Sequence, residues 1–335
     1  MKLLVSLLTA LIAACGIADA CTSMVVGCRG SATGRPLLWK HRDTGADNNF
    51  LARVEPTDST LGYVGLFNAG DSLLREAWMG MNDSGFAIMN TASYNLMPDT
   101  AKFLDQEAVV MSAALGRCTT VADFERMLSE WPRPMGVQAN FGVIDAEGGA
   151  AYFETDDHGF KRFDCADSPD DALIRTNYSI SGTHGLGSGR VRYNTATELT
   201  AEARQSHNIT PALLTDTLSR SFYHSALGRD CVGDSVVANQ DFIPRDISTA
   251  SIVVEGINPA HSGESMQMYA RLGYPPTAEL RMATLSYIPE DFLPNAEWRS
   301  EACDRSMRLW NEITPDGIDH PRRYIIMPRL RARMK

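Results

Sequence analysis

The stretch from Ala18 to Asp43 constrains this chain most. It begins Ala18-Asp19-Ala20, the small-residue pattern after which a signal peptidase cuts, and the residue that follows is Cys21. Cleavage there places a thiol and a free α-amine on the same residue. An unperturbed thiol has a pKa of roughly 8.5 and an α-amine roughly 7.7–8.0, so both can work near neutral pH as nucleophile and base. The stretch therefore predicts an N-terminal cysteine nucleophile.

The residues before Cys21 predict export. Met1-Lys2 carries one positive charge, and an apolar run from Leu3 to Ala14 follows it. This run is shorter than the roughly 20 apolar residues of a membrane-spanning helix and fits the core of a secretory signal. We expect residues 1–20 to be a signal peptide, the mature chain to be secreted or periplasmic, and no later segment to span a membrane.

A second interpretation of the N-terminus stays open. The run Ile12-Ala13-Ala14-Cys15 resembles a lipoprotein signal, which would lipidate Cys15 and anchor the chain. Cys21 would then be internal and could act only after a second cut between Ala20 and Cys21.

Charge and cysteine content exclude several classes of protein. A net charge of −10 argues against a nucleic-acid partner, because such proteins gather Lys and Arg on one face. The one basic cluster runs from Arg322 to Lys335 and is expected to be a solvated C-terminal tail. The cysteines are too sparse for a zinc site and allow up to two disulfides of unknown pairing. They are Cys15, Cys21, Cys28, Cys118, Cys165, Cys231 and Cys303.

The residues after Cys21 predict a β-hairpin. Thr22 to Cys28 is short, apolar and partly β-branched, and Pro36 to Arg42 is a second such run beyond a Gly- and Pro-containing turn. At about 3.3 Å per residue, arms of similar length return Lys40 and Asp43 to the end that carries Cys21.

The rest of the chain alternates strand patterns with pairs of helix patterns, and no repeat or linker divides it. We therefore expect one domain from 21 to 335, with two mostly antiparallel sheets covered by helices. The predicted strands are 61–67, 77–79, 86–91, 140–145, 150–155, 173–179, 248–255 and 267–272, and the predicted helices are 103–116, 120–131, 191–204, 210–222 and a mostly helical segment beyond Pro289.

Four features in combination carry a family resemblance. They are Cys-Thr-Ser after the cleavage pattern, the hairpin end Trp39-Lys40-His41-Arg42-Asp43, the turn Gly80 to Gly85 with Asn90 after it, and Thr176-Asn177. Together they resemble the N-terminal-nucleophile (Ntn) linear amide C–N hydrolases, which include choloylglycine (bile salt) hydrolases, penicillin V acylases and the penicillin acyltransferases. The resemblance extends from Cys21 to about Leu280. It implies an α+β fold, an αββα sandwich of two mostly antiparallel sheets between helical layers, and an exported enzyme without a cofactor.

The resemblance also implies roles for individual residues. Cys21 attacks the substrate carbonyl through sulfur while its α-amine carries the proton. Asp43 holds that amine by a charge-assisted hydrogen bond. Asn177 and Asn90 donate to the oxyanion of the tetrahedral intermediate.

Three positions fit the family pattern less closely. Lys40 stands where the family commonly has arginine, so it can favour the thiolate but lacks the planar fork. The late active-site arginine falls between Gly189 and Tyr193. The aromatic residue that follows favours Arg192, while Arg190 stays an alternative for this arginine and a candidate for substrate binding. Asn82 resembles the turn asparagine of the family, another substrate-binding candidate whose simpler interpretation is a turn former.

The leading hypothesis is a cysteine amidohydrolase that acts on a small linear amide. The histidines show no ligand spacing, so a metal site is not expected. Three alternatives remain: a dipeptidase-like N-terminal-cysteine peptidase, an acyltransferase, and a non-catalytic exported binding protein of the same fold, which Lys40 favours. The sequence leaves the acyl group, the leaving amine and a homo-oligomeric state open.

Overall fold

The structure is a computed structural model that describes residues 20–98, 100–102, 104–261, 263–315 and 324–334. The predicted signal peptide, apart from Ala20, and the alternative lipidation residue Cys15 lie outside the described residues.

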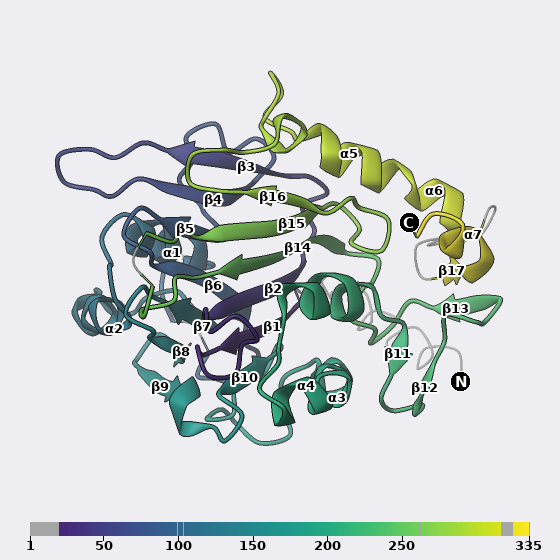
Figure 1. The fold of residues 1–335 in the computed structure, drawn as a ribbon, viewed down its shortest axis with the longest axis horizontal. Helices are drawn as coiled ribbons and strands as arrows, with labels where there is room; N and C mark the ends of the chain where they lie inside the picture. Colours follow the sequence, from purple (N-terminus) through teal and green to yellow (C-terminus); the bar gives the residue numbers. More distant parts are fainter. Residues whose placement is uncertain (1–19, 99, 103, 262, 316–323, 335) are drawn as a thin grey trace, which may run out of the picture.

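The first large sheet is built around the predicted hairpin. Its six strands are all antiparallel and lie in the order β10-β1-β2-β14-β15-β16 (Figure 1). In the hairpin, Cys21 lies opposite Arg42 and Ala20 lies opposite Asp43, which confirms the predicted return of the second strand to Cys21. The strands are β1 (Ala20–Val26), β2 (Leu37–Asp43), β10 (Ala172–Arg175), β14 (Ser248–Glu255), β15 (Gln267–Leu272) and β16 (Arg281–Ala283).

The second large sheet follows the chain order. Its seven antiparallel strands run from β3 to β9, each beside its neighbour in sequence, so each connection joins adjacent strands. They are β3 (Asn49–Val54), β4 (Tyr63–Asn68), β5 (Met79–Asn82), β6 (Ala87–Ala92), β7 (Ala139–Ile144), β8 (Ala150–Thr155) and β9 (Phe160–Asp164).

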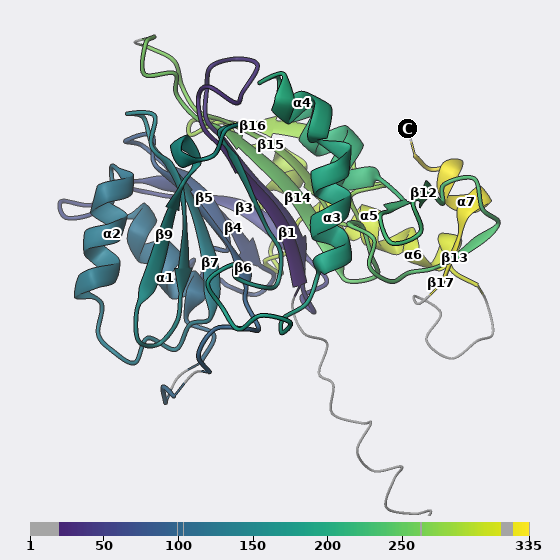
Figure 2. The same cartoon turned by 90° about the horizontal axis from the view of Figure 1, so that it is seen from below.

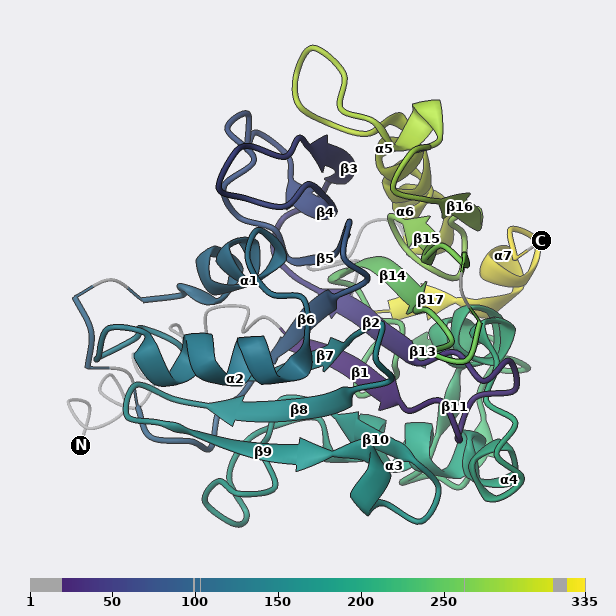
Figure 3. The ribbon, with the colours of Figure 1, turned by 60° about the vertical axis from the view of Figure 1, so that its left-hand side comes forward.

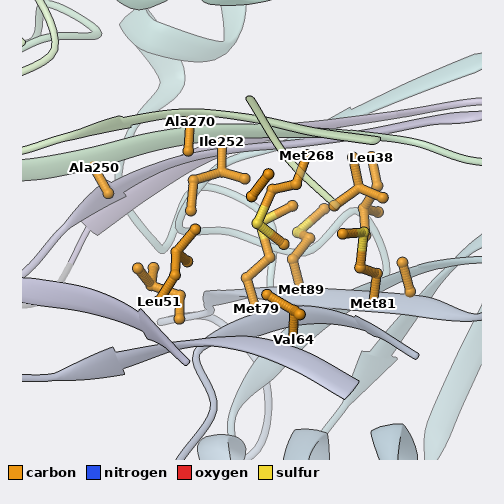
Figure 4. Packing of buried hydrophobic residues seen from close by; sticks show 14 of the residues in the cluster. Leu38, Leu51, Val64, Met79, Met81, Met89, Ala250, Ile252, Met268 and Ala270 are labelled. Atoms are coloured by element: carbon orange, nitrogen blue, oxygen red, sulfur yellow. The ribbon is translucent and has the colours of Figure 1, made fainter. Parts of the chain in front are cut away.

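The two sheets pack face to face across an apolar core. Leu38 and Ile252 from the first sheet meet Val64 and Met89 from the second, and all four are buried (Figure 4). Side chains alternate along a strand, so Leu38, Lys40 and Arg42 share one face of β2. Lys40 and Arg42 therefore continue the inner face of β2 from the apolar core toward Cys21.

Helices cover the outer face of each sheet (Figure 2). On the second sheet, α1 (Glu107–Leu115) contacts β5 and β6, and α2 (Val121–Glu130) begins with a capping box formed by Thr120 and Asp123. On the first sheet, α3 (Arg190–Leu199) contacts β10 and is followed by α4 (Ala201–Gln205). The predicted α+β sandwich with helical outer layers is confirmed.

The remaining elements are short. They are the 3-10 turns η1 (Cys165–Asp167), η3 (Leu218–Arg220) and η4 (Glu290–Phe292), the π-helical turn η2 (Leu213–Thr217), the strands β11 (Tyr223–His224), β12 (Arg229–Asp230), β13 (Val236–Ala238) and β17 (Tyr324–Ile326), and the helices α5 (Glu301–Arg308), α6 (Trp310–Ile313) and α7 (Met327–Arg331). No helix within the described ranges is long and apolar enough to span a bilayer.

Several predicted boundaries are wrong in ways that the contacts explain. The predicted strand 173–179 ends at Arg175, because Asn177 and Ser179 leave the sheet to bond with loops. The predicted helix 210–222 is a π-helical turn followed by a 3-10 turn. Strands β3 and β9 were not predicted; β9 is a partly exposed edge strand with the polar sequence FKRFD, which gives a weak apolar signal.

The basic C-terminal segment is not a solvated tail. Residues 324–326 form β17, which pairs with β13, and α7 follows it directly (Figure 3). Ile325, Met327 and Leu330 are completely buried in a small core with Trp310. The apolar residues that lie between the basic ones supply this packing.

This packing predicts a clear effect on stability. Replacing Leu330 with alanine is expected to lower the free energy of unfolding by about 2–5 kcal/mol, because it leaves a cavity in a closed core. Urea unfolding measures the change. Arg333→Ala is the control: its exposed ion pair with Glu312 should contribute no more than about 1 kcal/mol. Equal, small effects of the two substitutions would support a solvated tail instead.

Candidate active site

Cys21 opens onto a cavity between the ends of the two sheets. The cavity has a volume of about 560 Å³. It is lined by Cys21, Lys40, Arg42, Asp43 and Thr44 from the hairpin and its end, Trp78 before β5, Asn90, Ala92, Ser93 and Tyr94 from the end of β6, Asp105 and Glu107 at the start of α1, and Gln138 before β7.

Two side chains hold the backbone of Cys21 from both sides. The Cys21 nitrogen donates to Asn177 Oδ1 at 2.9 Å, and the Cys21 carbonyl oxygen accepts from Arg192 Nη1 at 2.6 Å. Arg192 also donates to Thr22 Oγ1 at 2.8 Å and to Asn177 Oδ1 at 2.7 Å. Asn177 therefore presents its oxygen to Cys21, while its Nδ2 donates to Ala92 O at 2.9 Å.

The approach of Arg192 depends on a glycine. Gly189 precedes α3 with φ +87°, a left-handed backbone conformation that residues with a side chain rarely adopt. A Cβ at this position would lie 2.5 Å from Arg192 Nη2 and 2.8 Å from Thr176 Oγ1. The glycine thus lets the first turn of α3 bring Arg192 against β1.

Arg192 is a buried cation. It is only 1% exposed, and burial together with the nearby Arg245 lowers its pKa to about 10. That pKa still leaves the guanidinium protonated at neutral pH, where Asp43 and Cys21 favour its charge.

Asp43 lies at the end of β2, opposite Ala20, in a buried polar cluster. Its Oδ2 accepts from Arg245 Nε at 2.9 Å, and its Oδ1 accepts from Ser248 Oγ at 2.5 Å. Burial raises the pKa of the Asp43 carboxyl, while the cations Arg245 and Arg192 oppose that rise. Sequence reasoning missed Arg245 and Ser248. Ser248 begins a predicted strand, but nothing in the sequence indicated that this strand pairs with β2.

His41, on the same strand, contacts this cluster through Ser248. Its Nε2 lies 2.9 Å from Ser248 Oγ, which donates to Asp43 and accepts from the Arg245 backbone nitrogen. His41 must therefore donate its Nε2 proton to the serine oxygen. Burial first, then Arg192 and Arg245, lower the pKa of His41 to about 3, so the imidazole is neutral at working pH.

His41 gives the fold a defined acid sensitivity. Its pKa in the folded state lies below the unfolded value of about 6.5, so its stabilising contribution is complete above pH 6.5 and is lost as pH falls toward 3. Between pH 6.5 and 4.5 this group should remove up to about 2.7 kcal/mol from the free energy of unfolding, at about 1.36 kcal/mol per pH unit. The free energy of unfolding, measured with urea at pH 6.5 and pH 4.5, should decrease less in His41→Gln than in the unaltered protein. An identical decrease in both proteins would contradict this explanation.

Lys40 and Asn90 form a second polar pair at the cavity wall. Lys40 Nζ donates to Asn90 Oδ1 at 2.6 Å and to Trp78 O at 2.9 Å. Because Lys40 engages the amide oxygen, Nδ2 is the atom that Asn90 can offer to a substrate oxygen. Lys40 is 2% exposed, so its positive charge acts in surroundings that screen it weakly.

The structure brings the six residues predicted as catalytic together at this site, while their roles stay predictions. They are Cys21, Lys40, Asp43, Asn90, Asn177 and Arg192. The two substrate-binding candidates lie elsewhere. Arg190 is exposed, with its guanidinium 4.4 Å from the centre of the Tyr178 ring. Asn82 is buried; it donates to the carbonyls of Leu115 and Cys118 and accepts from the turn nitrogens of Ser84 and Phe86. Its contacts are those of a turn former.

The other thiols of the described chain differ from Cys21 in position. Cys28, Cys118, Cys165, Cys231 and Cys303 are free, away from the cavity, and burial raises the pKa of each. Within the described residues no cluster of three or more His, Cys, Asp or Glu side chains is arranged to hold a metal ion.

Comparison with solved structures identifies the architecture. A variant of conjugated bile acid hydrolase from Clostridium perfringens, in which a single cysteine is replaced by alanine, matches with a TM-score of 0.50 and 10% sequence identity, over 79% of this chain and 92% of that one. This chain has the Ntn-hydrolase fold. At the level of sequence, no family model and no curated protein matches it.

Two further solved structures align less closely. An N-acylethanolamine-hydrolyzing acid amidase ortholog from Caenorhabditis elegans matches with a TM-score of 0.45 and 13% identity, over 72% of this chain and 94% of that one. A penicillin V acylase from Agrobacterium tumefaciens matches with a TM-score of 0.41 and 12% identity, over 80% and 87%.

Proposed function

We propose that this chain is an exported cysteine amidohydrolase that cleaves a linear, non-peptide C–N amide bond through an acyl-thioester on Cys21. One observation carries the proposal: Asn177 and Arg192 fix both backbone ends of Cys21 at the mouth of a cavity. A cysteine with a merely structural role would not need two buried polar side chains to orient its backbone. The conjugated bile acid hydrolase that shares this fold supports the same class of reaction.

The first half of the reaction forms the thioester. The α-amine of Cys21 takes the thiol proton, and the sulfur attacks the amide carbonyl to form a C–S bond and a tetrahedral oxyanion. Asn90 Nδ2 donates to that oxyanion, and such a donor contributes about 2.7–4 kcal/mol. As the C–N bond breaks, the α-ammonium returns its proton to the departing nitrogen.

The second half releases the acid. Water attacks the thioester carbonyl while the α-amine takes a proton from it, the C–S bond breaks, and the proton returns to sulfur. Lys40 favours the thiolate at both stages. Asp43, itself held by Arg245 and Ser248, orients the α-amine and favours its protonated form.

We infer export from the N-terminal sequence. The charged start, the apolar run to Ala14 and the Ala18-Asp19-Ala20 pattern support removal of residues 1–20, which exposes the amine that the reaction requires. The lipoprotein alternative through Cys15 predicts a different mature mass.

A substrate panel tests the reaction. Purified mature protein is incubated with an N-acyl amino acid, a conjugated bile salt, penicillin V and a dipeptide, with and without a competing amine. Release of acid from an N-acyl substrate supports the hydrolase, transfer to the added amine supports an acyltransferase, and selective cleavage of the dipeptide supports a peptidase. Absence of turnover together with slow, unselective labelling of Cys21 by iodoacetamide would support the non-catalytic alternative.

A further inference from the structure

Asn140 joins the two sheets beside the candidate active site. It lies on β7 in the second sheet, is completely buried, and is not among the described residues that line the cavity. Its Nδ2 donates to Thr176 O at 3.1 Å and, more weakly, to Tyr178 O at 3.4 Å, both beyond the end of β10 in the first sheet. These two residues flank Asn177. One amide group therefore holds the backbone on both sides of the residue that receives the Cys21 nitrogen.

The same amide also holds β6 next to Asn90. Asn140 Nδ2 donates to Thr91 Oγ1 at 3.0 Å, and Thr91 Oγ1 in turn donates to Thr176 O at 2.8 Å. Thr91 is the cross-strand partner of Asn140 and directly follows Asn90, the proposed oxyanion donor. Asn140 is therefore bonded to the chain neighbours of both asparagines at the site.

The oxygen of the Asn140 amide is also engaged. Its Oδ1 accepts from Ser179 Oγ at 2.6 Å, and Ser179 Oγ lies 2.8 Å from the hydroxyl of Ser93, which lines the cavity. Asn95 completes the link, because its Oδ1 accepts from the Ser179 nitrogen at 2.7 Å and its Nδ2 donates to Ser179 O at 2.9 Å. All four side chains are buried, where a polar group that loses its partner cannot turn to water. The network therefore favours a single arrangement of these loops.

The segment after β10 depends on such contacts. Residues 176–189 lie outside the strands of both sheets, so no β-ladder places them. Glu154, the cross-strand partner of Asn140 on β8, anchors the middle of this segment: its carboxylate accepts from the backbone nitrogens of Ile180 at 2.8 Å and Ser181 at 2.7 Å. Loss of the Asn140 amide therefore leaves that part anchored and loosens the earlier part, next to the nucleophile.

We propose that Asn140 is a positioning residue, which fixes Asn90 relative to Asn177 so that the oxyanion donor and the nucleophile keep the separation that the reaction needs. A displacement of about 1 Å can lower the rate of an enzyme by about 10²-fold. This inference rests on the proposed function for the role of Asn90, but the placement of Asn177 can be measured without turnover.

Hydrogen exchange tests the placement without a substrate. The backbone nitrogens of Tyr94 and Ser188 both donate to Asn177 O, so the exchange of their N–H groups reports on this residue. In Asn140→Ala, both groups should exchange about tenfold or more faster than in the unaltered protein, as measured by NMR, because the local opening costs less free energy. Unchanged exchange of both groups would overturn the inference.

Asn48 provides the matched control. It is equally buried, and its amide bonds the backbone of Ser300 at the start of α5, with Oδ1 accepting from the nitrogen and Nδ2 donating to the oxygen, both at 2.9 Å. Asn48→Ala should lower the thermal midpoint of unfolding as Asn140→Ala does, but change neither kcat nor the exchange of the Tyr94 and Ser188 groups. Equal effects of the two substitutions on exchange and kcat would indicate a general loosening and overturn the inference.

Turnover tests the link to Asn90. Asn140→Ala should lower kcat about tenfold or more and change KM little, because a misplaced oxyanion donor weakens binding of the transition state and not of the substrate. In an Asn90→Ala background the same substitution should lower kcat far less, since the donor that it places is gone. Additive losses, or an unchanged kcat in Asn140→Ala, would overturn the inference and leave the proposed function standing. No turnover by the unaltered protein, with faster exchange in Asn140→Ala, would contradict the proposed function alone.

Thr91 offers a second pair of variants, which decides the matter if Asn140→Ala does not fold. Thr91→Val preserves the volume of the side chain but removes the hydroxyl that bonds Asn140 and Thr176, whereas Thr91→Ser keeps it. We expect Thr91→Val to lower kcat and Thr91→Ser to retain most of it. The same kcat in the two variants would overturn the inference.

Discussion

Replacing Cys21 with alanine is expected to lower amidase kcat/KM by on the order of 10³-fold or more, to the background rate, because removing a covalent nucleophile removes the whole route through the thioester. Steady-state release of the acid measures the loss, and the thermal midpoint of unfolding shows that the variant is folded.

Cys28 offers a matched control for this substitution. It lies just after β1, is half-buried and free, and burial and Asp171 raise the pKa of its thiol, so it has no thiolate to offer at neutral pH. Cys28→Ala should retain wild-type turnover. Retained activity in Cys21→Ala would exclude Cys21 as the nucleophile.

Replacing Asp43 with asparagine is expected to lower kcat by about 10²-fold or more while keeping the shape of the site. Asparagine preserves the volume and a hydrogen bond to Ser248 but not the negative charge that the proposed mechanism assigns to orienting the α-amine. Loss of an adjacent opposite charge favours the neutral amine, so its pKa should fall, and the acidic limb of the pH profile of kcat/KM should move about one unit or more to lower pH.

The shift of the pH profile separates an orienting role from a structural one. A substitution that only loosened the site would lower the rate without moving the limb. Asp83→Asn, at an exposed turn that pairs with Arg53, is the control and should change neither the rate nor the profile. An unmoved limb in Asp43→Asn would contradict the assigned contact with the α-amine.

Local sequence signals predicted those parts of the fold that local physics determines. The hairpin of β1 and β2 has apolar arms of equal length around a strong turn, and α2 has both members of its capping box, so each forms where the sequence indicates. By contrast, β9 is an edge strand with the polar sequence FKRFD, so it gives only a weak apolar signal. The burial of Leu330 depends on Trp310 and Ile325, which it meets only in the folded molecule.

The residues of the candidate site also differ in whether local sequence signals could locate them. Residues on or beside the hairpin, Cys21, Lys40 and Asp43, could be placed by register alone. Arg192 was found by its family pattern, and the glycine before α3 explains its approach. Arg245 and Ser248 could not be found, because their link to Asp43 requires the pairing of β14 with β2 across more than 200 residues of sequence.

The central claim is that sulfur and a free α-amine act from one residue. The most direct measurement is the intact mass of catalytically active protein, quenched in acid during turnover and mapped by peptide sequencing. The claim predicts a chain that begins at Cys21 and carries one acyl group on that residue, removable by hydroxylamine. Active protein in which Ala20 still precedes Cys21, or an acyl group on another residue, would contradict it.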